Sequence, residues 1–156
     1  KDAIVAVMCL CEVAAYCKKH GKTLWDMMLD TYEKYGYYKE SQYTITLKGI
    51  DGSRQIAEIM DKLRKNPPKA FGGLSVLNFR DYEMDRAVDM GTGEEGKTGP
   101  PKSNVLYFEL PDDAWCCARP SGMEPKIKFY MGVKGASLED AQNKLAQLTE
   151  DVKAAL

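Results

Sequence analysis

The sequence predicts an α+β fold in which an antiparallel sheet of four or five strands carries two helices on one face. Three observations lead to this fold class. Apolar and polar residues alternate at several places after residue 37, as they do in half-buried strands. Two amphipathic helical segments lie among and after those strands, and two helical segments without strands of their own precede them. We therefore expect residues 1–36 to be the last helices of a preceding domain and residues 37–156 to form a C-terminal domain.

The first part is expected to contain two helices. Residues 3–19 form an apolar run that is too long for a strand and predicts a buried helix. Basic side chains at 18–20 suit the negative end of the helix dipole, and Gly21 suits the position after the last turn. The capping-box sequence at 23–26 begins a second helix, which ends at Gly36. The lone histidine of the chain is therefore expected to be a helix-end residue rather than a catalytic group.

The second part is expected to begin with a strand at 37–48, where Tyr43, Ile45 and Leu47 alternate with polar residues. Two prolines after Asn66 end the following helix, because proline cannot continue a helix. The remaining elements are a helix that begins at 51–53, a strand at 74–82, a Gly/Pro-rich loop at 89–103, strands at 103–110 and 114–118 joined by a turn at 111–113, a strand at 126–134, and a helix from 137 onward.

Composition and charge exclude several classes of protein. Apolar residues make up 44% of the chain and charged residues 29%, which is typical of a globular rather than a disordered protein. The 22 basic and 23 acidic residues give a net charge of −1, whereas nucleic-acid binding usually needs a basic excess that displaces counterions. The apolar run near the N-terminus is too short and too interrupted to span a bilayer. We expect neither a nucleic-acid partner nor a membrane partner.

The cysteines indicate a reducing compartment. There are five, an odd number, and no Cys-x-x-Cys motif occurs. Adjacent Cys116 and Cys117 lie on a predicted strand and point to opposite faces, so they do not pair. We expect reduced, packed thiols in a cytoplasmic protein.

Residues 91–98, Gly-Thr-Gly-Glu-Glu-Gly-Lys-Thr, match the G-x-x-x-x-G-K-[ST] pattern of a nucleotide-binding P-loop. A functional P-loop follows a buried strand and opens a helix whose N-terminus holds the phosphates. Here Gly99 and two prolines end any helix at once, and Glu94 and Glu95 would repel a nucleotide. We therefore predict a solvated loop without a nucleotide site.

A better candidate site lies around Arg119, where one predicted strand ends and a tight turn leads into the next. The planar guanidinium of arginine can grip two phosphate oxygens, and the Ser121 hydroxyl adds a third donor. Gly122 permits close backbone approach, successive N–H groups in a tight turn bind anions, and Lys128 adds positive charge from the next strand. A plain hairpin turn explains these residues equally well, and the carboxylates at 112–113 would weaken an anion site if they faced it.

Residues 119–130, Arg-Pro-Ser-Gly-Met-Glu-Pro-Lys-Ile-Lys-Phe-Tyr, resemble the signature R-P-S-G-T-E-P-K-I-K-[FY]-Y of the alpha-D-phosphohexomutase family. All positions agree except Met123, where the family usually has threonine. Further segments that resemble the family lie at 1–3, 22–25, 32–38 and 98–106. The chain therefore resembles the end of the third domain plus the fourth domain of a phosphohexomutase, and it is most similar to bacterial-type phosphoglucomutases and phosphomannomutases.

The resemblance implies a TATA-box-binding-protein-like fold for the fourth domain and an activity for the parent enzyme. Family members interconvert hexose 1-phosphate and hexose 6-phosphate through a phosphoserine and a bisphosphate intermediate, assisted by Mg²⁺. This chain has neither the catalytic Ser-His pair nor the Asp-x-Asp-x-Asp loop that holds the metal, and it opens inside an apolar helix, as an excised fragment would. The Gly-Glu-Glu at 93–95 imitates the family's sugar-reading loop, which lies earlier in the family, and is not assigned to it. We expect a fragment that is inactive alone, with no catalytic residue and no metal or other cofactor, and Mg²⁺ only in the parent enzyme.

Position by position, the family's phosphate loop corresponds to Arg119, Ser121, Gly122 and Met123, with Lys128 as an added cation. The resemblance implies that the first two residues bind phosphate through side chains and the next two through backbone N–H groups. Methionine lacks the hydroxyl that threonine supplies, and one hydrogen bond contributes about 0.5–1.5 kcal/mol. The expected partners are a sugar phosphate and the missing N-terminal domains of the same chain.

Two local expectations accompany this assignment. Glu124 is expected to face away from the phosphate and pair with Lys126, and domain closure is expected about a hinge near 37–41. The main alternative is a stand-alone phospholigand-binding module without catalysis, which a catalytic serine and an Asp-rich loop upstream of Lys1 would exclude. A nucleic-acid module on the same sheet is a third hypothesis, which the net charge of −1 disfavours.

Overall fold

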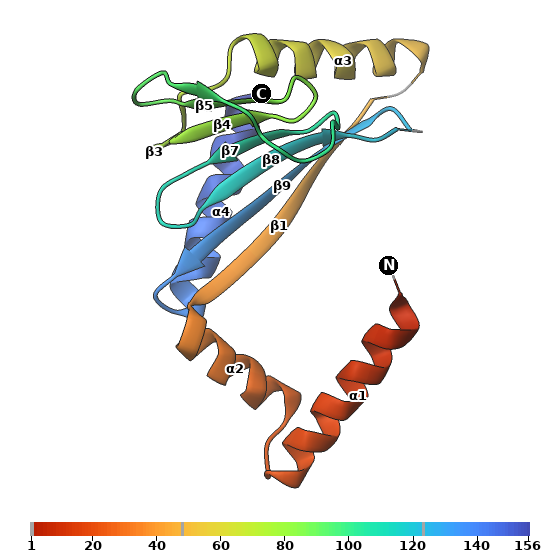
Figure 1. Cartoon of the computed structure of the whole chain (residues 1–156), viewed down its shortest axis with the longest axis vertical. Coiled ribbons are helices and arrows are strands. Elements are labelled where there is room, and N and C mark those ends of the chain that lie inside the picture. Colours follow the sequence, from red (N-terminus) through yellow and green to blue (C-terminus); the bar gives the residue numbers. More distant parts are fainter. Residues whose placement is uncertain (1, 48, 123) are drawn as a thin grey trace. The chain divides into compact units, whose positions relative to one another are not determined.

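The computed structural model describes residues 2–47, 49–122 and 124–156, so the predicted site residue Met123 lies outside the described residues. The chain divides into two compact units, Lys1–Tyr37 and Tyr38–Leu156. That the first unit ends a preceding domain stays a prediction. The elements, in chain order, are α1 (Ala3–Lys19), α2 (Leu24–Tyr35), β1 (Tyr37–Thr46), α3 (Ile50–Lys65), β2 (Ala70–Phe71), β3 (Leu74–Ser75), β4 (Asn78–Asp81), β5 (Arg86–Asp89), β6 (Glu95–Gly96), β7 (Leu106–Glu109), β8 (Trp115–Pro120), β9 (Lys126–Gly135) and α4 (Leu138–Ala154) (Figure 1).

The first unit consists of the two predicted helices. The Asp2 carboxylate begins α1, because it accepts hydrogen bonds from the N–H groups of Ile4 (3.0 Å) and Val5 (3.1 Å), which have no helical carbonyl partner. The helix ends at His20, whose N–H donates to carbonyls of the last turn. His20 is therefore a helix-end residue, as predicted.

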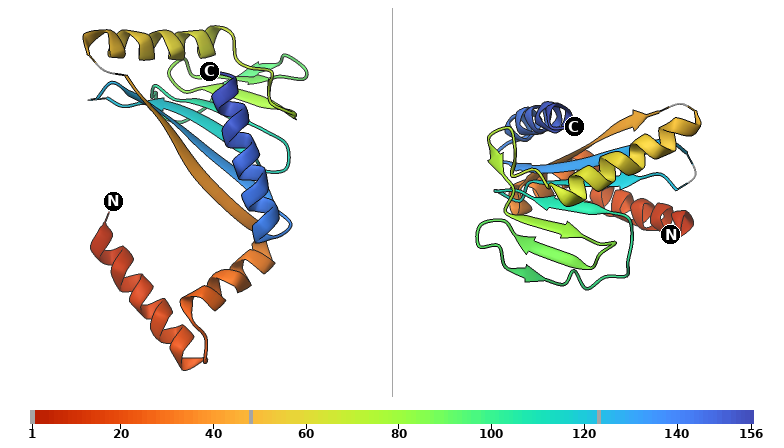
Figure 2. Two further views of the ribbon diagram at one scale, coloured as in Figure 1. Left: turned by 180° about the vertical axis from the view of Figure 1, so that it is seen from behind. Right: turned by 90° about the horizontal axis from the view of Figure 1, so that it is seen from above.

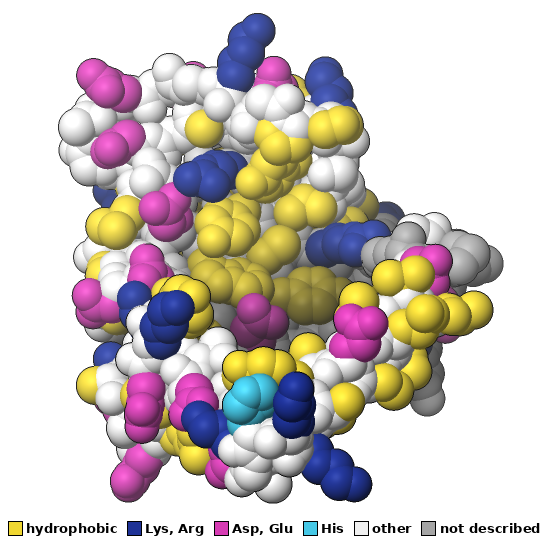
Figure 3. Space-filling view, turned by 60° about the horizontal axis from the view of Figure 1, so that its bottom comes forward, with side chains coloured by type: hydrophobic (Ala, Val, Ile, Leu, Met, Phe, Trp, Pro, Cys, Tyr) yellow, Lys and Arg dark blue, Asp and Glu magenta, His cyan; other side chains and the backbone are white. Residues whose placement is uncertain are grey.

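The apolar side chains of α1 are exposed within this unit, which differs from the buried helix that the sequence predicts. Ile4 is 75% exposed and Met8 is 63% exposed, and Cys17 is the one buried residue among those described in the helix. Figure 3 shows hydrophobic side chains along this helix. The neighbouring helix α2 alone offers too little surface to bury α1, which is apolar on all sides. Despite this composition, none of the helices in the described ranges has the length and apolar character needed to cross a membrane.

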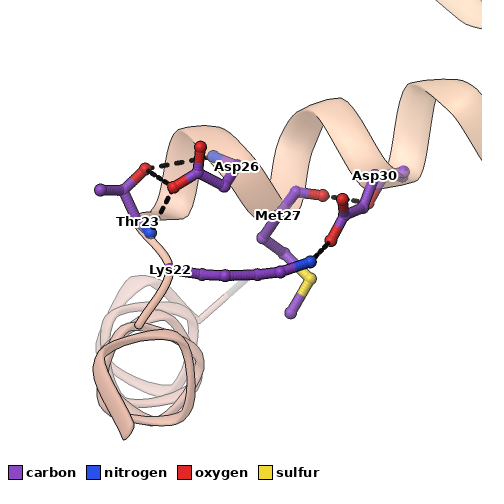
Figure 4. A network of polar contacts seen from close by, with 6 residues as sticks. Lys22, Thr23, Asp26, Met27 and Asp30 are labelled. Carbon is purple, nitrogen blue, oxygen red and sulfur yellow. Dashed lines mark hydrogen bonds and ion pairs between the residues drawn. The ribbon is translucent and has the colours of Figure 1, made fainter. Parts of the chain in front are cut away.

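The second helix begins with the predicted capping box (Figure 4). The Thr23 hydroxyl oxygen accepts a hydrogen bond from the Asp26 N–H (3.1 Å), and the Asp26 carboxylate accepts one from the Thr23 N–H (2.7 Å). Hydrogen bonds from the hydroxyl and the N–H of Thr23 lower the pKa of Asp26. Lys22 and Asp30 form an ion pair beside this cap. The capping box at 23–26 is thus confirmed.

The second unit is built on a sheet with the strand order β1-β9-β8-β7-β4-β5-β6, and the pairings from β9 through β6 are antiparallel. The predicted α+β class is confirmed. The sheet has seven strands in the part of the chain that the structure describes, rather than the four or five that were predicted. The difference arises from β5 and β6, a hairpin of short strands beyond β4.

Two aspartates organise this hairpin. The Asp85 carboxylate accepts hydrogen bonds from the Thr98 N–H (3.1 Å), the Thr98 hydroxyl (2.8 Å) and the Gly99 N–H (3.3 Å). Asp89 accepts hydrogen bonds from both N–H groups at 91–92, at 2.9 and 2.8 Å. These contacts give the glycine- and proline-rich stretch a defined path. The loop predicted at 89–103 is therefore wrong at Glu95–Gly96, which form the strand β6.

The strand predicted at 74–82 is divided in two. β3 pairs with β2 in a separate two-stranded sheet, and β4 joins the main sheet. The turn between β2 and β3 contains Gly72 with φ +55°, and a side chain there would collide with the Asp151 carboxylate of α4. The β2–β3 turn therefore lies against the far end of the chain, a contact that local periodicity does not contain.

Both α3 and α4 cover one face of the main sheet, as predicted (Figure 2). Every second strand residue points towards these helices, and the core between them includes Ile56, Met60, Leu63, Phe79, Leu106, Phe108, Cys116, Ala118, Ile127, Phe129, Met131, Leu145, Leu148 and Val152. The intervening residues define the opposite, open face, which includes Arg80, Tyr107, Glu109, Trp115, Cys117, Arg119, Lys128 and Tyr130. Figure 3 looks onto this face and shows hydrophobic side chains gathered over it.

Candidate anion-binding site

Arg119 and Lys128 lie directly opposite each other on the neighbouring strands β8 and β9. Their strand neighbours Ala118 and Ile127 are fully buried, so both cations point to the open face. Directly opposed side chains in such a pair have Cβ atoms about 4.5–5.5 Å apart, and like charges at this spacing are destabilising. Within the described residues, neither cation forms a salt bridge. The position therefore combines two adjacent positive charges, neither of which forms a salt bridge with a described acid.

Backbone hydrogen bonds shape the loop between these strands. The Ser121 N–H donates to the Lys126 carbonyl (2.7 Å), and the Lys126 N–H donates to the Glu124 carbonyl (2.7 Å). The Glu124 carboxylate pairs with the Lys126 ammonium at 2.8 Å, as predicted. The hydrogen bond from Lys126 lowers the pKa of Glu124, and the charges of Lys126 and Lys128 lower it further. The acid of the loop is thus engaged by Lys126.

A pocket of about 330 Å³ opens beside the two cations. Its lining consists of Arg119, Pro120, Ser121, Gly122, Lys128 and Tyr130. It brings together four of the five predicted site residues, and Met123 lies outside the described residues. A side chain added to Gly122 would meet no atom within 4 Å, so the backbone there is open to a ligand. Among the described residues, the lining holds two cations, the hydroxyls of Ser121 and Tyr130 and no carboxylate, which suits an anion.

The two carboxylates that would weaken such a site lie elsewhere. Asp113 pairs with Lys134 (3.0 Å) at the opposite end of β8 from Arg119. Asp112 and Asp113 occupy a turn with left-handed φ values of +57° and +59°, and neither lines the pocket. Neither carboxylate therefore faces the candidate anion site, so they do not weaken it in the way that the sequence allowed.

Sequence reasoning missed Tyr130 as a pocket residue. Tyr130 lies two positions beyond Lys128 on the same face of β9, directly opposite Cys117. The alternation of the strand contained this signal, but only the strand register shows that the phenol borders the same pocket. Burial raises the pKa of the Cys117 thiol, and the Arg119 charge opposes that rise only in part. The thiol beside the pocket is therefore protonated at neutral pH and is a poor nucleophile.

The other sequence motifs form no second site among the residues that the structure describes. Residues 91–98 contain the turn of the β5–β6 hairpin and lead to β7 rather than into a helix, so they lack the structural context of a P-loop. Glu95 of this stretch pairs with Arg86. Across the described ranges, no group of three or more His, Cys, Asp or Glu side chains converges on a point where a metal ion could bind.

No protein-family model matches the chain. The phosphoglucomutase of Staphylococcus aureus strain bovine RF122 / ET3-1 is 34% identical over 145 residues, which cover 93% of this chain and 26% of that protein, and the phosphoglucomutase of strain N315 is 33% identical over the same extent. A crystal structure of the exocytosis-sensitive phosphoprotein pp63/parafusin, a phosphoglucomutase from Paramecium, in its open form, covers 99% of this chain and 27% of that chain. Its TM-score of 0.54 at 17% sequence identity supports the fold alone. The chain thus spans about a quarter of the length of its relatives. Sequence similarity along 93% of the chain, together with the shared fold, shows that this chain belongs to the phosphoglucomutase family.

Proposed function

We propose that the pocket at Arg119 and Lys128 binds the phosphate group of a sugar phosphate in a phosphohexomutase that interconverts hexose 1-phosphate and hexose 6-phosphate. The observation that supports this most strongly is the direct opposition of these two cations without an acidic partner in the described residues. Two like charges at this spacing disfavour the empty site, and a dianion between them turns repulsion into attraction.

Each pocket residue has a distinct role in this proposal. The Arg119 guanidinium donates two parallel hydrogen bonds to phosphate oxygens, and the Lys128 ammonium adds a point charge from the facing strand. The Ser121 hydroxyl and the Gly122 N–H complete the site. The Ser121 N–H does not take part, because it already donates to the Lys126 carbonyl. A backbone contribution from Met123 remains a prediction from the family signature.

In the reaction, the site holds the phosphate that is not being transferred. The substrate must present either end of the sugar to one phosphoserine by way of a bisphosphate intermediate. A fixed anion clamp away from the reacting centre positions the other end and lowers the entropic cost of the chemical step. This chain supplies positioning, and the chemistry belongs to other parts of the longer protein.

The proposed Mg²⁺ site of the parent enzyme also lies in those other parts. The described residues of this chain do not converge in a way that fits a metal ion, so no step of the proposal passes through one here.

The proposed partners are the sugar phosphate and the N-terminal domains of the same chain. We place the enzyme in the cytoplasm, where the unpaired cysteines suit a reducing environment. A hinge for domain closure is proposed at 37–41, beside the division between the two units.

An NMR titration of the 156-residue chain with inorganic phosphate and glucose 1-phosphate tests the site. We expect shifts of the amides at 119–128 that are lost in Arg119→Ala, because the guanidinium provides the main charge-assisted hydrogen bonds. Arg80→Ala is the matched control. Arg80 lies on the same open face but pairs with Glu109 (2.8 Å) and does not line the pocket. Equal shifts in the unchanged chain and in Arg119→Ala, or a response confined to other regions, would refute the assignment.

A further inference from the structure

The anion pocket has more room than a phosphate group needs. Its volume of about 330 Å³ equals that of roughly ten water molecules at about 30 Å³ each. A phosphate group has a central atom and four oxygens, so it fills only a minor part of this space. Among the described lining residues, Pro120 and Tyr130 are the ones besides Arg119, Ser121, Gly122 and Lys128, and their surfaces are mainly apolar. The rest of the pocket therefore suits a part of the ligand that is less polar than phosphate.

The strand register places Tyr130 next to the proposed anion position. Tyr130 follows Lys128 by two residues on the open face, which is about 7 Å along the strand. The pair formed by Cys117 and Tyr130 lies one row further towards the middle of the sheet than the pair formed by Arg119 and Lys128. A ring attached to the anion and extending along the sheet would meet the phenol of Tyr130 first.

The surface beyond this row is aromatic, and its charges are paired. Tyr107 and Trp115 stack with their ring centroids 5.9 Å apart. The indole of Trp115 lies so close to Gly132 that a side chain at that glycine would collide with it. Arg80, over the ring of Tyr107, is neutralised by Glu109. This part of the open face, which lies outside the pocket lining, therefore presents aromatic rings and a paired arginine rather than a competing unpaired charge.

We infer that Tyr130 packs the face of its phenol ring against the sugar ring of the bound sugar phosphate. The inference rests on the proposed phosphate site and adds to it a residue that separates a sugar phosphate from inorganic phosphate. A pyranose ring presents C–H groups on its faces, and these lose contact with water when they pack on an aromatic ring. The phosphate loop then supplies affinity for the anion, and Tyr130 supplies the preference for a ligand that carries a ring.

Calorimetric titrations of the 156-residue chain with inorganic phosphate and with glucose 1-phosphate test this inference. Burial of roughly 40 Å² of apolar ring surface is worth about fivefold in affinity. We therefore expect Tyr130→Ala to weaken glucose 1-phosphate about fivefold and to leave inorganic phosphate unchanged. Tyr130→Phe keeps the ring and is expected to retain both affinities. Tyr107→Ala, an open-face tyrosine outside the pocket lining, is the matched control and is expected to retain both.

The outcomes separate this inference from the proposed function. Unchanged binding of glucose 1-phosphate to Tyr130→Ala would overturn the role of the ring. Equal losses for both ligands in Tyr130→Ala and Tyr130→Phe would assign the hydroxyl to the phosphate, and would overturn the inference while the phosphate site stands. Absence of binding of either ligand to the unchanged chain would overturn the proposed function, and the inference with it. Amide NMR spectra of each variant distinguish a local effect from loss of the fold.

Discussion

At the residue scale, the pocket is organised around Arg119 and Lys128, which face each other across two strands. Without a ligand this arrangement carries a cost in free energy, because like charges directly opposite in a sheet repel. Glu124, the neighbouring acid of the loop, forms its salt bridge with Lys126 rather than with either cation, so it offsets the repulsion only in part. Such a local cost is expected where a protein retains charges for binding rather than for stability.

Lys128→Gln is predicted to separate stability from binding. Removal of one of the two opposed charges should raise the free energy of unfolding by about 0.2–1 kcal/mol at low ionic strength, and the gain should shrink as salt screens the charges. The same change should weaken phosphate binding. Urea unfolding at low and high salt, with and without phosphate, measures both effects.

Lys126→Gln is the matched control for this prediction. It removes a cation from the same face of β9, but one that already pairs with Glu124 at 2.8 Å. We expect it to give no gain in stability. A Lys128→Gln protein that is less stable than the unchanged chain at low salt, or that binds phosphate equally well, would contradict the account.

The sequence contained most of the site but not its geometry. The signature at 119–130 indicated the residues of the proposed phosphate loop, because a charged strand end, a tight turn and a second strand are local features. The opposition of Arg119 and Lys128 follows from the β8–β9 register. The place of Tyr130 in the pocket and the orientation of Asp113 towards Lys134 also depend on strand pairing, which periodicity alone does not contain.

At the element scale, long elements were predictable and short ones were not. The helices and the strand β9 have enough residues for a clear period, and they occur where the pattern indicated. The two-residue strands β2, β3 and β6 have no period to detect. Contacts with distant residues accompany them instead. The Asp85 carboxylate binds Thr98 and Gly99 after β6, and Gly72 between β2 and β3 lies close to the Asp151 carboxylate.

Asp85→Ala is predicted to loosen the β5–β6 hairpin while the rest of the sheet remains folded. The hydroxyl of Thr98, with the N–H groups of Gly99 and Thr98, lowers the pKa of Asp85 in the folded chain. A carboxyl whose folded-state pKa is depressed stabilises the fold above its unfolded pKa of about 3.9, and this contribution is lost as the pH falls through the folded-state value. Hydrogen exchange of the β5 and β6 amides measures the effect.

The hairpin should therefore lose protection in acid in the unchanged chain, whereas Asp85→Ala should show weak protection of these amides at neutral pH as well. Asp89→Ala is a useful comparison, because Asp89 also accepts two backbone N–H groups in this stretch but contacts neither Thr98 nor Gly99. Full protection of β6 in Asp85→Ala at neutral pH would show that the Asp85 contacts are not what orders the hairpin.

At the scale of the whole molecule, the chain consists of two units that differ in how far their apolar side chains are buried. The second unit has its own core, which joins both helices to the sheet. The first unit exposes the apolar side chains of α1. The chain matches about a quarter of the length of its phosphoglucomutase relatives, and its described residues offer an anion pocket but no metal cluster. This division is consistent with the proposed role, in which the segment positions a sugar phosphate and the chemistry takes place elsewhere in a longer protein.

The most direct test of the phosphate site is a crystal structure of this chain with bound glucose 1-phosphate. The account predicts phosphate oxygens at hydrogen-bond distances of about 2.7–3.2 Å from the Arg119 guanidinium, the Ser121 hydroxyl and the Lys128 ammonium. It also predicts that the phosphate lies between the facing ends of β8 and β9. A phosphate bound away from Arg119 and Lys128 would contradict the account, as would an empty pocket at ligand concentrations that saturate the chain in solution.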